Sequence, residues 1–130
     1  MLTRHFRHEP RLKAGRELAR MAHALIDISD GLVHEAGLLA EASGVRMVLD
    51  AGMFPIHPSA KALAPRLKVS VEELAASSGE EYELLASLPR GKSAWAMKRG
   101  MKIVGLVAKG RGVMVTGLQK KSPSVFNHFR

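Results

Sequence analysis

The sequence contains no cysteine, and its 130 residues include only one tryptophan, one tyrosine and four phenylalanines. Without cysteine the chain has no disulfide framework, and it lacks the thiolates that most structural zinc sites use. The shortage of aromatic residues bears on nucleic acids, because proteins that bind single strands usually stack bases on aromatic side chains beside a positive groove. We therefore do not expect a nucleic-acid partner.

Long hydrophobic runs are also missing. The longest, "SGVRMVLDAGMF" at 43–54 and "KIVGLVAKG" at 102–110, are interrupted by charges and fall far short of the roughly 20 apolar residues that cross a bilayer. The amino-terminal segment "MLTRHFRHEP" carries charges where a secretory signal needs an apolar centre. These features predict no contact with a membrane and a cytoplasmic location.

Positive charge and apolar residues are abundant. The formal net charge is +8, while 46% of the residues are hydrophobic and 25% are charged. This composition and length predict one folded domain over residues 1–130. The basic excess favours an anionic partner such as a nucleotide or an acidic protein surface, although solubility alone explains it equally well.

The pattern of apolar residues alternates between helical and strand-like segments. We expect helices within 10–24, 31–42, 59–67, 70–77 and 91–100, with Pro65 kinking or ending the third. We expect strands at 24–28 and 45–50, a strand within 77–88, and two strands within 102–116 joined by a hairpin-type turn "KGRG". This order predicts an α+β fold, with layers of helices packed against a mixed β-sheet.

A first cluster of polar residues, Asp27, Ser29 and Asp30, lies where the strand 24–28 gives way to the helix 31–42. Free N–H groups at the start of a helix favour phosphate oxygens, whereas two carboxylates repel them. A magnesium ion between the carboxylates and a phosphate removes this repulsion, because Mg²⁺ binds both carboxylate and phosphate oxygens. The alternative is structural: Ser29 or Asp30 caps the helix, and Asp27 pairs with a nearby cation.

A second acidic cluster, "GEEYE", places Glu80, Glu81 and Glu83 around Tyr82, before or within a strand. Strand alternation puts Glu81 and Glu83 on one face. Such a face suits a cationic substrate group or a metal ion, but it is also typical of a charged sheet edge that resists aggregation.

Other catalytic patterns are missing from the sequence. The six histidines have no zinc-site spacing, and no serine lies in a Gly-x-Ser-x-Gly elbow. The glycines near the carboxyl terminus form neither a P-loop nor a dinucleotide-binding fingerprint. Covalent catalysis by a nucleophile is therefore not indicated.

Five segments, in order and spacing, resemble the carboxyl-terminal half of thiamine-monophosphate kinases. They are "PRLKAGRELA", "ALIDISDGL", "LLAEASGV", "SSGEEYELL" and the terminal "VFNHF". The resemblance spans nearly the whole chain and implies a three-layer α/β/α domain with a mixed sheet, like the carboxyl-terminal domain of aminoimidazole ribonucleotide synthetase. The terminal aromatic-x-His-Phe favours the thiamine branch of this superfamily.

The resemblance also implies a reaction and a set of binding residues. ATP transfers a phosphoryl group to thiamine phosphate, giving thiamine diphosphate, with Mg²⁺ and without a covalent intermediate. Asp27 and Asp30 correspond to magnesium ligands, and Ser29 to a residue that contacts ATP phosphates. Glu80, Glu81 and Phe126 correspond to contacts with the thiamine substrate.

The amino-terminal ATP-binding domain of the family has no counterpart in these 130 residues. We therefore expect the chain to act with that domain or with a separate subunit, and to self-associate through the surface that the domain would cover. Two alternatives stay open. The chain is a stand-alone ligand- or protein-binding domain of the same superfamily, or it is half of a related ATP-using enzyme, such as the hydrogenase maturation factor or aminoimidazole ribonucleotide synthetase.

Overall fold

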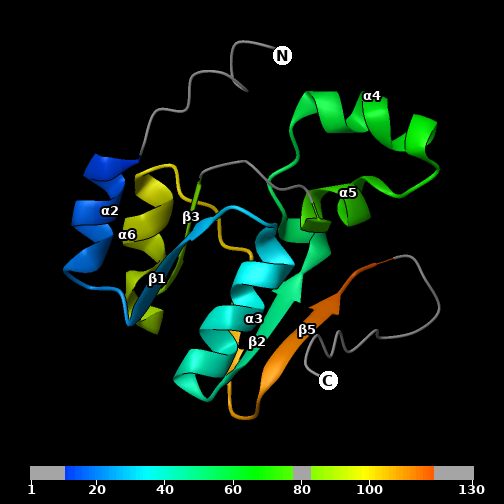
Figure 1. Cartoon of the computed structure of the whole chain (residues 1–130). Coiled ribbons are helices and arrows are strands. Elements are labelled where there is room, and N and C mark those ends of the chain that lie inside the picture. Colours follow the sequence, from blue (N-terminus) through cyan, green and yellow to red (C-terminus); the bar gives the residue numbers. More distant parts are fainter. Residues whose placement is uncertain (1–10, 78–82, 119–130) are drawn as a thin grey trace.

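The structure, a computed structural model, describes residues 11–77 and 83–118. Helices and strands alternate along this part of the chain (Figure 1). The α-helices are α2 (Leu12–Ala19), α3 (Leu32–Ser43), α4 (Pro58–Leu67), α5 (Val71–Ser77) and α6 (Ser93–Lys98). Short 3₁₀ turns, η1 (Ala51–Met53) and η2 (Arg90–Lys92), precede α4 and α6. The strands are β1 (Ala24–Ile28), β2 (Arg46–Asp50), β3 (Glu83–Ser87), β4 (Gly105–Ala108) and β5 (Gly112–Thr116). The α+β class with mixed strand pairing is confirmed.

The strand β2 lies at the centre of a three-stranded mixed sheet, in the order β4-β2-β5. It pairs antiparallel with β4 and parallel with β5. The sequence-based hairpin between β4 and β5 is therefore wrong: the turn exists, but β2 separates the two strands. Burial explains this order, because Met47 and Leu49 of β2 are in the core, whereas Leu106 and Val107 of β4 are exposed and suit a sheet edge.

A second, two-stranded antiparallel sheet pairs β1 with β3. The helix α3 packs against strands of both sheets and connects them. Its buried residues join those of β2, β5 and β3 in one hydrophobic core. On the opposite side of the small sheet lies α2, where a Cβ on Gly15 would come within 3.5 Å of the Leu84 side chain. The small sheet thus lies between helices, as the predicted layered arrangement requires (Figure 1).

Two helix ends follow the predicted signals closely. Gly44 ends α3 in the left-handed conformation, with φ of 63°. Ser70 and Glu73 form a reciprocal capping box at the start of α5, with N···O distances of 2.9 and 3.0 Å. The helix α4 runs two residues past Pro65, which lies in its last turn, and ends at Leu67 with Lys68 as its C-cap. The first helix, α2, is shorter than the predicted segment.

None of the helices in residues 11–77 and 83–118 is long and apolar enough to cross a membrane.

Candidate magnesium and phosphate site

The first polar cluster lies at the junction between β1 and α3, as the sequence predicts. Asp27 is exposed on β1, one residue before the buried Ile28 that ends the strand. Ser29, half-buried, and Asp30, exposed, form the turn that follows. All three residues thus lie within four positions, at the carboxyl end of a strand and before a helix, where α/β proteins commonly bind ligands.

The turn does not cap the helix in the expected way. The N-cap of α3 is Gly31, with φ of 111°, which has no side chain to accept a capping hydrogen bond from the helix N–H groups. The prediction that Ser29 or Asp30 caps the helix is therefore wrong. A positive φ at this position strains any residue with a side chain, so glycine allows the chain to turn directly from Asp30 into the helix.

The side chain of Glu35 accepts the hydrogen bonds of the turn that precedes α3. Its Oε1 atom accepts hydrogen bonds from the Ser29 hydroxyl at 3.1 Å and from the Asp30 main-chain N–H at 3.2 Å. The side chain is only 3% exposed, and it lies among the apolar residues on the buried face of α3. The carboxylate therefore reaches back from the first turn of the helix to the turn that precedes it, where the helix dipole also favours negative charge.

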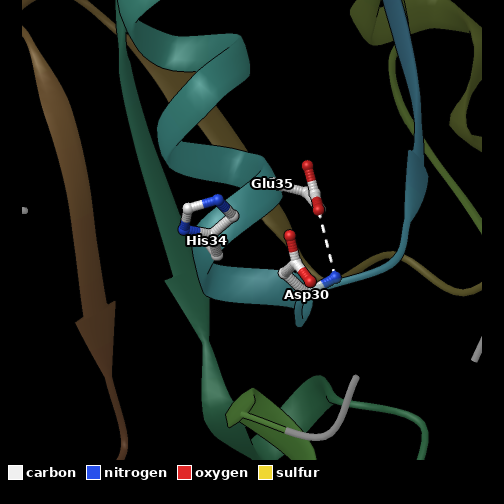
Figure 2. A group of neighbouring side chains, drawn as sticks. All are labelled: Asp30, His34 and Glu35. Atoms are coloured by element: carbon white, nitrogen blue, oxygen red, sulfur yellow. Dashed lines mark hydrogen bonds between the residues drawn. The ribbon is translucent and has the colours of Figure 1, made fainter. Parts of the chain in front are cut away.

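Three side chains at the start of α3 form a group that can hold a metal ion: Asp30, His34 and Glu35 (Figure 2). One ligand atom from each lies within 4.8 Å of the others. Two oxygen ligands and one nitrogen ligand suit several divalent cations. Asp27 is not a member of this group. Of the two predicted magnesium ligands, only Asp30 therefore lies beside other side chains that can bind a metal ion.

Pairing between β1 and β3 places Glu83, the one residue of the second acidic cluster that the structure describes, at the same end of the small sheet as the β1–α3 junction. Ile28, the last residue of β1, pairs with Glu83, the first residue of β3. The segment that contains Glu80 and Glu81 therefore leads directly into the residue opposite Ile28. The Glu83 carboxylate is bound by the Arg11 guanidinium at 2.7 and 3.1 Å, so it serves an ion pair at the surface. Glu80, Glu81 and Phe126 lie outside the described residues.

No family model matches the chain, but individual proteins do. It is 33% identical to the thiamine-monophosphate kinase of Aquifex aeolicus over 129 residues, which are 99% of this chain and 41% of that protein. It is 37% identical to the thiamine-monophosphate kinase of Pyrococcus abyssi over 105 residues, 81% of this chain and 32% of the relative. The chain is a relative of the thiamine-monophosphate kinases. It spans 41% of the length of the first of these relatives and 32% of the second.

Solved structures of thiamine-monophosphate kinase also match this chain. The structure of AaThiL complexed with AMPPCP and TMP superposes with a TM-score of 0.78 at 32% identity, over 93% of this chain and 38% of that one. The hydrogenase maturation protein HypE of E. coli superposes with a TM-score of 0.65 at 18% identity, over 83% of this chain and 36% of that one. The second likeness shows a shared fold alone. The chain therefore matches a portion of the thiamine-monophosphate kinases, consistent with their carboxyl-terminal domain.

Glu35 and His34 were not predicted as site residues from the sequence. A signal for Glu35 exists, because it falls on the same helical stripe as Leu32, Ala36 and Leu39, which are all buried. A glutamate on an apolar stripe must find hydrogen-bond donors, and those available are on the preceding turn. His34 carries no comparable signal, since a lone exposed histidine on a helix is ordinary.

Proposed function

We propose that the chain is the carboxyl-terminal portion of an ATP-dependent thiamine-monophosphate kinase. In this reaction the γ-phosphoryl group of ATP passes to a phosphate oxygen of thiamine phosphate, giving thiamine diphosphate and ADP. The observation that carries the proposal is the match to kinase relatives over nearly the whole chain, together with the superposition on AaThiL complexed with AMPPCP and TMP.

The residues at the β1–α3 junction fit a role in this chemistry. Phosphoryl transfer depends mainly on positioning and on neutralising charge, and magnesium ions supply much of that neutralisation when bound. Asp27 and Asp30 are exposed carboxylates, and such oxygens are the ligands that Mg²⁺ prefers. In the proposed role these aspartates hold magnesium, and Ser29 lies next to the ATP phosphates.

The proposed contacts to thiamine phosphate are Glu80, Glu81 and Phe126. The two glutamates rest on the family resemblance of the "SSGEEYELL" segment, and Glu83, which follows them in the sequence, pairs with Ile28 next to the β1–α3 junction. Phe126 rests on the family resemblance of the terminal "VFNHF" segment.

Complete activity requires more than these residues, because the relatives are more than twice as long as the matching region. We propose that the chain acts with a polypeptide equivalent to the rest of those kinases, in the cytoplasm, and that it self-associates. Large exposed apolar side chains support association, among them Leu67, Met97 and Leu106, each more than half exposed. A monomeric sedimentation profile at high protein concentration would contradict the self-association.

A chimera tests the proposed function. The segment of the Aquifex aeolicus kinase that matches this chain is replaced by residues 1–130, and formation of thiamine diphosphate from ATP and thiamine phosphate is measured. The matched control is the same Aquifex protein without that segment. We expect magnesium-dependent product from the chimera and none from the control. A folded chimera that releases no thiamine diphosphate would contradict the proposal.

A further inference from the structure

Glu35 is the one charged side chain that is buried among the residues the structure describes. The salt bridges found in this part of the chain join Arg11 to Glu83 and Arg99 to Glu17, so neither supplies a cation to Glu35. Burying a carboxylate without a cation is costly unless hydrogen bonds compensate it. The hydrogen bonds that Glu35 accepts must therefore offset the cost of burying its carboxylate.

The two donors to Glu35 come from the turn that carries the proposed ligands. The Ser29 hydroxyl and the Asp30 N–H both point to the same atom, Oε1. A hydroxyl has one hydrogen and two lone pairs. Because the hydrogen of Ser29 is donated inward to Glu35, only lone pairs remain for a ligand on the outside.

We propose that Glu35 is a positioning residue that makes the Ser29–Asp30 turn a cation site. It fixes the Asp30 main chain, and it orients the Ser29 hydroxyl so that oxygen lone pairs accompany the exposed Asp30 carboxylate. Such a surface accepts a divalent cation and its water molecules. A phosphate oxygen meets the Ser29 side chain only through that cation or its water, since two acceptors repel each other.

The proposed orientation of its hydroxyl refines the role of Ser29 in the kinase reaction. The statement about the phosphate oxygen rests on the proposed function. The cation part does not, because it follows from the direction of two hydrogen bonds and from the exposed carboxylate of Asp30. The two parts are therefore separable by measuring metal binding and amide exchange without any nucleotide.

The experiment titrates Mn²⁺ into the 130-residue chain and follows free Mn²⁺ by electron paramagnetic resonance. The variants are Glu35→Gln, Glu35→Ala and Ser29→Ala, with Glu41→Gln as the matched control, since Glu41 is exposed on the same helix. Hydrogen exchange of the Asp30 amide is measured in parallel by NMR.

We expect Glu35→Ala to weaken Mn²⁺ binding by about 10-fold or more, the usual loss when a residue that supports a metal ligand is removed. It should also expose the Asp30 amide to exchange. Glu35→Gln keeps an acceptor oxygen and should retain both the affinity and the slow exchange. Glu41→Gln should match the unaltered chain. Ser29→Ala should weaken Mn²⁺ binding while the Asp30 amide stays protected.

Four results would overturn the proposal. Unchanged Mn²⁺ affinity in a folded Glu35→Ala would show that Glu35 does not position the turn. A loss of affinity in Glu35→Gln as large as in Glu35→Ala would show that the charge itself binds the metal, as in direct coordination with Asp30 and His34. Failure of the unaltered chain to bind Mn²⁺ at millimolar concentration would remove the cation site. Full affinity in Ser29→Ala would remove the hydroxyl from it. If Glu35→Ala does not fold, a loss of affinity in Glu35→Gln or full affinity in Ser29→Ala still refutes the proposal.

Discussion

Replacing Gly105 by alanine should break the edge of the three-stranded sheet. A Cβ at this position would lie 2.9 Å from the Leu49 Cα atom and 3.0 Å from the Val48 carbonyl carbon, and it would press directly against the Val48 carbonyl oxygen. These are main-chain atoms of β2, which is hydrogen-bonded on both sides. They cannot yield as the end of a flexible side chain would, so β4 must move away from Leu49, its partner at Gly105.

The expected cost is about 1–3 kcal/mol in the free energy of unfolding, the range for overpacking a well-packed site. Urea denaturation followed by circular dichroism measures it, as a lower midpoint with an unchanged m-value. Gly91→Ala is the matched control, because nothing lies within 4 Å of a Cβ there, and it should change stability by less than about 0.5 kcal/mol. The reasoning would be refuted by a Gly105→Ala midpoint equal to that of Gly91→Ala.

Three further substitutions test other contacts by the same denaturation assay. Ser70→Ala removes one hydrogen bond of the α5 capping box and should cost about 1 kcal/mol; no change would mean that the box does not stabilise the fold. Gly44→Ala places a side chain at φ of 63° with free space around it, so the expected cost of about 1 kcal/mol is backbone strain alone; a stabilised variant would refute it. Arg11→Ala removes an ion pair whose side chains are 47% and 41% exposed, so it should cost less than about 1 kcal/mol and less still in high salt; a larger, salt-independent loss would contradict a surface role.

Local signals in the sequence predict the helices and strands well, but not how the strands pair. The strand 24–28 and the end of α3 at Gly44 follow directly from apolar pattern and a C-cap glycine. The "KGRG" turn has the composition of a hairpin, yet the most buried strand, β2, lies between the two strands it joins. Which strand occupies the centre of a sheet depends on burial across the whole domain, and turn residues do not encode it.

The sequence predicts where Asp27, Ser29 and Asp30 lie in the fold, but not the contacts around them. Asp27, Ser29 and Asp30 lie at the strand-to-helix junction, as their spacing indicates. The sequence does not reveal that Gly31 takes the N-cap and that Glu35 binds the turn. Those contacts depend on where the helix begins, and a shift of one or two residues changes which side chain reaches back to the turn.

Thiamine diphosphate formation by the chimera carrying Asp30→Asn tests the central claim most directly. The account predicts a fall in rate of about 100-fold or more, because in the proposed role of Asp30 the amide replaces a charged magnesium ligand next to the transferring phosphate. Glu41→Gln in the same chimera, which also removes one exposed carboxylate, should leave the rate unchanged. An Asp30→Asn chimera as active as the Glu41→Gln chimera would contradict the assignment of this turn to magnesium and phosphate.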